Sequence, residues 1–191
     1  TRTEAWLRES LNDQTHLNVV ITDVTSAYSI INLQGPLSRA LLATLTDADL
    51  SAGAFGFATI QTMEVHYARV FAQRMTYTGG LGFELFAPSD VAASLFEAVV
   101  AAGTAFDLRL VGLAALDSLR LEKANRDYTH DVDNCDTPLE VGLKFTCAFD
   151  TPFRGQDALA PSADAVPTRR LVQVALDDPE PLLRGGETLL R

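Results

Sequence analysis

The segment 58–86 constrains the fold of this 191-residue chain more than any other part of the sequence. Apolar and polar residues alternate in two successive runs up to Tyr77, with the two-residue period of a β-strand. Glycines follow at positions 79, 80 and 82, and a short apolar run, Phe83–Phe86, comes next. We therefore predict a β-hairpin that turns near residues 66–68, then a glycine loop, then a further strand.

The remainder of the chain alternates predicted strands with predicted helices, which indicates an α+β architecture. Within it, the segment 58–149 is expected to form a split β-α-β sheet with helices on one face. Ser89 is the expected N-cap of one helix. The further predicted strands are Val19–Asp23, Tyr28–Leu33, Val141–Phe149 and Leu171–Leu176, and the predicted helices begin near Glu4, Pro36, Ser89, Leu113 and Arg154.

Charge and composition exclude several classes of partner. The chain carries 25 acidic and 15 basic residues, for a net charge of −10, and its nearest approach to a basic cluster is Arg169–Arg170. Such a chain is a poor ligand for phosphate backbones, so we expect no nucleic-acid partner. No apolar run approaches the roughly 18 residues of a membrane span, so we expect no membrane association. Cys135 and Cys147 are read as reduced thiols, which predicts a cytoplasmic location, and a single disulfide between them stays open as an alternative.

Familiar catalytic and metal-binding signatures are absent from the sequence. It contains no G-x-S-x-G, H-E-x-x-H or phosphate-binding Walker loop. Its histidines, His16, His66 and His130, lie in unrelated segments, and its two cysteines have no nearby histidine pair. We expect no metal site and assign no histidine to catalysis.

The stretch Arg74–Leu85 is the best candidate for a binding site, and its residues allow two interpretations. It can be two strands joined by a glycine turn, with Tyr77 on a sheet face and Glu84 exposed. Alternatively, the glycines let the backbone approach a flat ligand closely. Tyr77 would then supply an aromatic wall, and Glu84 a two-oxygen acceptor for a ligand edge with paired donors.

This stretch resembles the Y-T-G-E-x-G-[FW]-E block of the aminomethyltransferase (glycine-cleavage T-protein) superfamily. Further blocks resemble that superfamily in the same order, which makes the resemblance specific: L-Q-G-P-x-S-R at Leu33–Arg39, A-x-D-S-L-R-L-E at 115–122, T-P-L-E-A-G-L at Thr137–Leu143 and F-x-G-x-x-A-L at Phe153–Leu159. The resemblance implies the α+β folate-binding fold of aminomethyltransferases. It assigns residues 1–160 to a folate-binding domain that lacks its N-terminal part, and 168–191 to the opening strands of a truncated C-terminal β-barrel.

Finer detail resembles the folate domains of dimethylglycine and sarcosine dehydrogenases. Leu116 stands where T-proteins carry an arginine that contacts folate, and Ala115–Lys123 is closer to those dehydrogenases. In them the module follows an FAD-dependent amine oxidase domain, which oxidises an N-methyl group. The resemblance implies that this chain captures the one-carbon unit from a sarcosine- or dimethylglycine-type amine on tetrahydrofolate, as 5,10-methylenetetrahydrofolate. FAD would be bound only in an upstream domain outside this chain, so the chain alone is expected to be inactive.

Motif position implies which residues bind the cofactor. Tyr77 matches the tyrosine on the pterin wall, and Glu84 matches the glutamate that accepts hydrogen bonds from the pterin edge. The family's catalytic aspartate falls near Thr3, and Glu4 is read as an ordinary acid of a helix's first turn, so no catalytic residue is assigned. Gly80 stands where the family that this chain resembles usually has a glutamate. A stand-alone aminomethyltransferase, a folate-dependent demethylase and a non-catalytic folate-binding protein stay open as alternatives.

Overall fold

The computed structural model describes residues 1–12, 14, 17–178, 180–183 and 185–188. His16, one of the histidines considered above, lies outside the described residues. The chain forms two compact units, Thr1–Leu119 and Arg120–Arg191. The domain boundary that the resemblance places between residues 160 and 168 stays a prediction.

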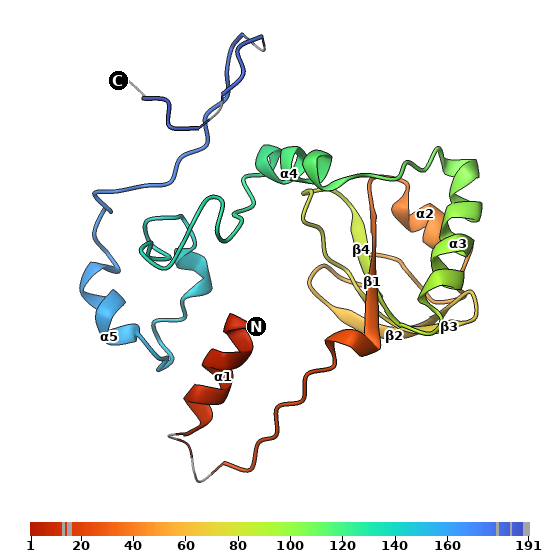
Figure 1. The fold of residues 1–191 in the computed structure, drawn as a ribbon, viewed down its shortest axis with the longest axis horizontal. Coiled ribbons are helices and arrows are strands. Elements are labelled where there is room, and N and C mark those ends of the chain that lie inside the picture. The colour runs from red at the N-terminus through yellow and green to blue at the C-terminus, as the bar shows by residue number, and fades with distance from the viewer. Residues whose placement is uncertain (13, 15–16, 179, 184, 189–191) are drawn as a thin grey trace. The chain divides into compact units, whose positions relative to one another are not determined.

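The first unit is built around a four-stranded antiparallel sheet with strand order β1-β4-β3-β2 (Figure 1). β2 and β3 form the predicted hairpin, and His66 takes a left-handed conformation (φ 55°) in its turn. β4 then returns between β1 and β3. The elements are α1 (Arg2–Asn12), β1 (Tyr28–Gln34), α2 (Ser38–Leu42), β2 (Ile60–Val65), β3 (Ala68–Gln73), β4 (Gly82–Pro88), α3 (Ala92–Gly103) and α4 (Leu113–Glu122), whose last turn enters the second unit.

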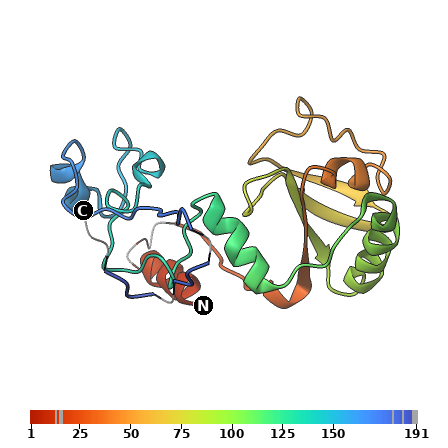
Figure 2. The ribbon, with the colours of Figure 1, turned by 90° about the horizontal axis from the view of Figure 1, so that it is seen from above.

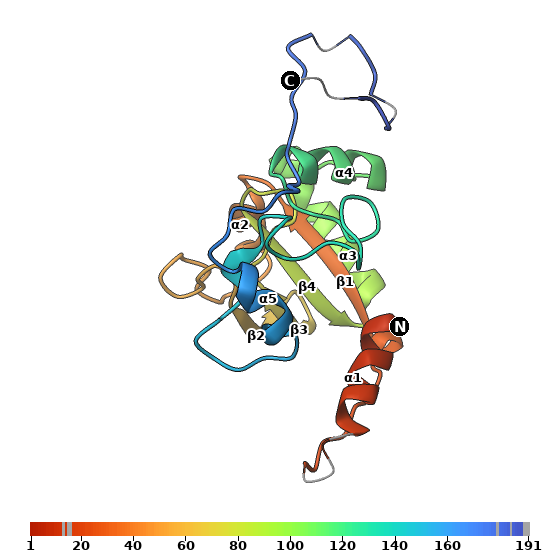
Figure 3. The ribbon, with the colours of Figure 1, turned by 90° about the vertical axis from the view of Figure 1, so that its left-hand side faces the viewer.

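One face of this sheet forms the core of the first unit, because α2 and α3 cover it (Figures 1 and 2). In Figure 3, α3 lies behind the strands. Every second residue of each strand points into this core, as the pleat requires. The buried side chains come from the strands and from both helices, and include Leu33, Val65, Val70, Phe83, Leu85, Leu41, Leu42, Leu95 and Val99.

The other face of the sheet is more open and carries two contrasting rows of side chains. An apolar row joins Ile30, Phe86 and Phe71, and Ile30 and Phe71 are 54% and 43% exposed. The next row is polar, because Asn32 and Gln73 are the register partners of Glu84 on its two sides. The open face of the sheet therefore carries a polar row of side chains beside an apolar row.

Turns and side-chain hydrogen bonds hold the second unit together. Its regular elements are α5 (Gln156–Leu159) and two short 3₁₀ segments, Lys144–Thr146 and Ala160–Ser162. The T-P-L-E block forms reciprocal bonds: Thr137 N donates to Glu140 Oε2 (2.9 Å), and Glu140 N donates to Thr137 Oγ1 (3.3 Å). These bonds lower the pKa of Glu140 below its usual range, the backbone bond from Thr137 being the largest cause.

The α+β class and the hairpin are confirmed, but several local expectations are wrong. Val19–Asp23 and Leu171–Leu176 are not strands in the described structure, because neither run finds a neighbouring strand with which to form a ladder. Val141–Phe149 is interrupted at Gly142, whose φ of +71° cannot continue a strand, and goes on as turns. Ser89 does not cap α3; Val91 holds that position, and Ser89 Oγ donates to Ser26 O (2.9 Å).

The predicted split β-α-β unit is also absent from the described strands. Within 58–149, the strands β2, β3 and β4 follow one another and pair antiparallel, and no described strand returns to the sheet after α3. No described helix is both long enough and apolar enough to cross a membrane.

Candidate functional site

The glycine loop is anchored to the turn that follows β1, so two of the sequence blocks meet in space. Gly35 N donates to Leu81 O (2.7 Å), and Gly35 has a φ of +114°, which favours glycine. Arg74 Nη1 donates to Gly82 O (3.0 Å) from the other side of the loop. Gly79 N donates to Thr76 Oγ1 (3.1 Å) and closes the loop internally. These bonds fix the backbone between the end of β3 and the start of β4.

The three loop glycines have different physical roles. Gly79 has a φ of +83°, a left-handed backbone conformation that favours glycine. A Cβ on Gly82 would overlap the side-chain amide of Gln34, so this position admits no side chain unless Gln34 moves. A Cβ on Gly80 would meet nothing within 4 Å, so the loop has room for the glutamate that the resemblance predicts at this position.

These differences predict a matched pair of outcomes. Gly82→Ala is expected to destabilise the protein by about 1 kcal/mol, because the Gln34 amide must swing away and lose its hydrogen bonds to Asn32 and Met75. Gly80→Ala is expected to change stability by less than about 0.5 kcal/mol, as an open surface position does. Urea denaturation followed by circular dichroism measures both. Equal midpoints for the two variants would contradict the close approach of Gln34 to Gly82.

Tyr77 and Glu84, the two predicted cofactor-binding residues, line one cavity of about 600 Å³. Tyr77 comes from the start of the glycine loop, and Glu84 from the middle of β4. The cavity is in the size range of small-molecule and cofactor sites. The structure thus brings together the two side chains that the sequence singled out, while their roles stay predictions.

The Glu84 carboxylate has the properties of a ligand-binding acceptor. Its side chain is half-buried, and within the part of the chain that the structure describes it has no hydrogen-bond or ion-pair partner. No other acid is among the described residues that line the cavity. An ionised carboxylate only accepts hydrogen bonds, so two acceptor oxygens are available to a ligand that presents donors.

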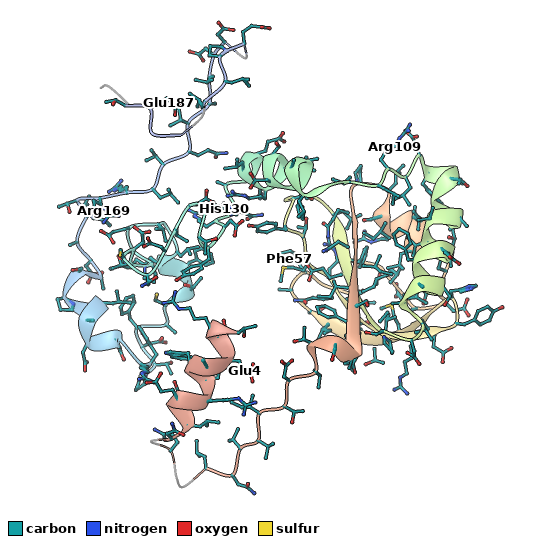
Figure 4. The ribbon with its side chains drawn as sticks, in the orientation of Figure 1. Glu4, Phe57, Arg109, His130, Arg169 and Glu187 are labelled. Atoms are coloured by element: carbon teal, nitrogen blue, oxygen red, sulfur yellow. The ribbon has the colours of Figure 1, made fainter. Side chains whose placement is uncertain are left out.

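Apolar side chains supply most of the remaining wall. Leu116 lines the cavity, so the position at which T-proteins were expected to carry an arginine does face this site. The extended segment 108–112 contributes a further side, and Leu110 in it is 71% exposed. The guanidinium of Arg109 points outward and pairs with Asp107 (2.6 Å; Figure 4). The wall of the cavity is thus mostly apolar and carries few polar groups.

Sequence reasoning missed two polar residues of the cavity, Asn32 and Gln34. Their alternation in β1 was visible, but it did not show which strand lies beside β1. The register places Asn32 directly opposite Glu84. Gln34 Nε2 donates to Asn32 Oδ1 (3.3 Å) and to Met75 O (3.5 Å), so Gln34 connects β1 to the segment before the glycine loop.

Thr3 and Glu4 line a different cavity, of about 720 Å³, beside the apolar row of the sheet. Glu4 Oε1 accepts a hydrogen bond from Arg8 Nε (2.9 Å), which is the largest cause of a lowered Glu4 pKa. Glu4 thus behaves as the ordinary helix acid that was expected. His66 lies in the β2–β3 turn, and His130 pairs with Asp127 (2.8 Å) in the second unit.

The model of the family described as "GCVT N-terminal domain" matches residues 1–151. The chain is 37% identical to 4-methylaminobutanoate oxidase (formaldehyde-forming) of Paenarthrobacter nicotinovorans, over 88% of this chain and 21% of that protein. It is 38% identical to the mitochondrial sarcosine dehydrogenase of Homo sapiens, over 90% of this chain and 19% of the relative. It is also 38% identical to an aminomethyltransferase of Listeria monocytogenes serotype 4b (strain F2365), over 83% of this chain and 43% of that protein. The chain therefore spans about a fifth of the first two relatives and less than half of the third.

Proposed function

The chain belongs to the family of GCVT N-terminal domains, and we propose that it binds tetrahydrofolate and captures on it a one-carbon unit taken from an N-methylated amine. The observation that carries this proposal is the half-buried Glu84 carboxylate, without a partner among the described residues, in one cavity with Tyr77. A carboxylate left in this state in a mostly apolar cavity favours a ligand that donates hydrogen bonds to it.

The chemistry of the cavity suits a reduced pterin. The neutral pterin edge presents two neighbouring N–H donors, and the two oxygens of Glu84 accept both in a paired geometry. The Tyr77 ring offers an apolar face for the flat ring system. The cavity volume of about 600 Å³ accommodates a ligand of this size.

We place the chain as one module of a larger amine dehydrogenase or oxidase. Two of the relatives are named as such enzymes, and the chain spans about a fifth of their length. FAD, bound in another part of such a protein, would supply the oxidation of the methyl group. Formaldehyde and tetrahydrofolate then condense to 5,10-methylenetetrahydrofolate and water. Residues that hold folate near the released carbon make this capture effectively intramolecular. A small sarcosine- or dimethylglycine-type substrate and a cytoplasmic location belong to the same proposal.

The aminomethyltransferase relative supports a second candidate, a stand-alone aminomethyltransferase or folate-dependent demethylase. Leu116 disfavours it, because this apolar residue lines the cavity where T-proteins were expected to carry an arginine. A third candidate, non-catalytic folate binding, is favoured by the composition of the cavity: Glu84 is the one acid among its described lining residues. No catalytic residue is assigned under any of the three.

An experiment on the full-length protein that contains this chain separates these candidates. We expect a flavin absorption band, and we expect added tetrahydrofolate to divert free formaldehyde into methylenetetrahydrofolate during oxidation of a methylated amine. Folate binding without flavin would favour the stand-alone transferase or the binding protein. Formaldehyde release that tetrahydrofolate leaves unchanged, together with no folate binding, would overturn the proposal.

A further inference from the structure

Asn32 is placed to act together with Glu84. It lies on β1 as the direct register partner of Glu84 on β4, and both side chains line the same cavity. Directly opposite residues on one face of an antiparallel pair have Cβ atoms about 4.5–5.5 Å apart. The hydrogen-bonding groups along one edge of a flat ring ligand are separated by a similar distance. One such edge can therefore contact both side chains.

Neighbouring groups fix the orientation of the Asn32 amide. The carbonyl oxygen of Met75 can only accept, so the Gln34 atom that approaches it is the donor Nε2 (3.5 Å). The same Nε2 also approaches Asn32 (3.3 Å), and the atom facing it must therefore be the acceptor Oδ1. Among the described residues, no protein acceptor bonds Asn32 Nδ2. Asn32 thus presents a hydrogen-bond donor next to the two acceptors of Glu84.

This arrangement matches one ligand edge in detail. The edge of a 2-amino-4-oxo pterin presents an amino donor, a ring N–H donor and a carbonyl acceptor, in that order. Glu84 can accept from the two donors, and the remaining carbonyl needs a donor beside it. We propose that Asn32 is a specificity-determining residue whose Nδ2 donates to the 4-oxo group of the bound pterin. The assignment rests on the proposed function, because it takes the ligand to be a folate.

The assignment predicts discrimination between folates that differ at one position. Tetrahydroaminopterin carries an amino group in place of the 4-oxo group, so it cannot accept from Asn32 Nδ2. Leaving a ligand acceptor without its donor lowers affinity by about 5- to 150-fold. Tetrahydroaminopterin also lacks the ring N–H, which weakens its bond to Glu84. That second effect is the same in every variant that keeps Glu84, so it cancels when the ratio of the two affinities is compared between variants.

The test measures the affinities of the full-length protein that contains this chain for tetrahydrofolate and tetrahydroaminopterin by calorimetry. Asn32→Ala is expected to weaken tetrahydrofolate about tenfold and to leave tetrahydroaminopterin nearly unchanged, so the preference falls about tenfold. Asn18→Ala, at an exposed asparagine outside the cavity lining, is the matched control and is expected to change neither affinity.

The other outcomes would contradict either the assignment of Asn32 or the proposed function. Tetrahydrofolate binding that Asn32→Ala leaves unchanged overturns the assignment of Asn32 while the proposed function stands. Equal weakening of both ligands also overturns it, because a structural role at Asn32 would act on both alike. Failure of the unsubstituted full-length protein to bind either ligand overturns the proposed function, and the assignment with it. Circular dichroism spectra of both variants show whether the sheet is retained.

Discussion

Glu84→Ala is expected to abolish measurable tetrahydrofolate binding, and Glu84→Gln to weaken it about 100-fold. Glutamine keeps the size of the side chain but replaces one acceptor oxygen by an NH₂ donor, which faces a ligand donor. Hydrogen bonds to a charged group contribute about 1.5–3 kcal/mol each, and a paired set is lost here. Calorimetric titration with tetrahydrofolate measures the change.

The structure supplies a control for this prediction. Within the described residues Glu84 has no protein partner, so its replacement by glutamine should leave the urea midpoint unchanged. Glu64→Gln makes the same chemical change on the same sheet, at an exposed position that does not line the cavity of Glu84, and should not affect binding. Binding that survives Glu84→Gln at full strength would mean that the folate site lies elsewhere.

The strands of the first unit were predictable, but their order was not. The alternation in 58–77 and the run after the glycine loop are local patterns, and both became strands. β1 pairs with β4, about fifty positions further along the chain, and no local pattern carries that information. The open face of the sheet follows from this order. The sequence pattern therefore predicts the strands, but it does not predict which side chains lie together on the open face of the sheet.

The second unit shows where local propensity fails. Val141–Phe149 and Leu171–Leu176 have the composition of strands, but a strand needs a partner. Leu171 N does bond Glu140 O (3.0 Å), and no described ladder continues from that contact. Turn-forming glycine at 142 and reciprocal bonds within the T-P-L-E block decide the local structure instead. The backbone conformation of Gly142 and the hydrogen bonds of the preceding block therefore outweigh the apolar pattern of residues 141–149.

The candidate site was predictable only where a motif carried it. Tyr77 and Glu84 belong to one block of the sequence, and they line one cavity. Asn32 stands in another block, and in the sequence it is an ordinary polar residue of an alternating strand. Its relevance depends on the β1–β4 register and on the orientation that Gln34 imposes. Both are tertiary properties.

The block 115–122 also contains a residue that the structure assigns to stability. Arg120 is 2% exposed, and its guanidinium bonds the Asp131 carboxylate and the Asn125 carbonyl (3.2 Å). Asp131 in turn accepts from Asp127 N (2.8 Å), so the ion pair closes the loop that follows α4. Burial excludes the water that would otherwise screen this pair. Removing one partner leaves an uncompensated charge in place.

Arg120→Met is therefore expected to destabilise the protein by about 3–5 kcal/mol, because Asp131 loses its cation while methionine keeps most of the buried volume. Arg169→Met removes an arginine that pairs with Asp136 (2.6 Å) in the same unit but is 66% exposed, and should change stability by less than about 1 kcal/mol. Urea denaturation compares the two. The double variant Arg120→Met with Asp131→Asn should recover part of the loss, because it removes the orphaned charge. Equal effects of the two arginine substitutions would show that burial does not set the strength of the Arg120–Asp131 pair, and the loop would then depend on its backbone turns alone.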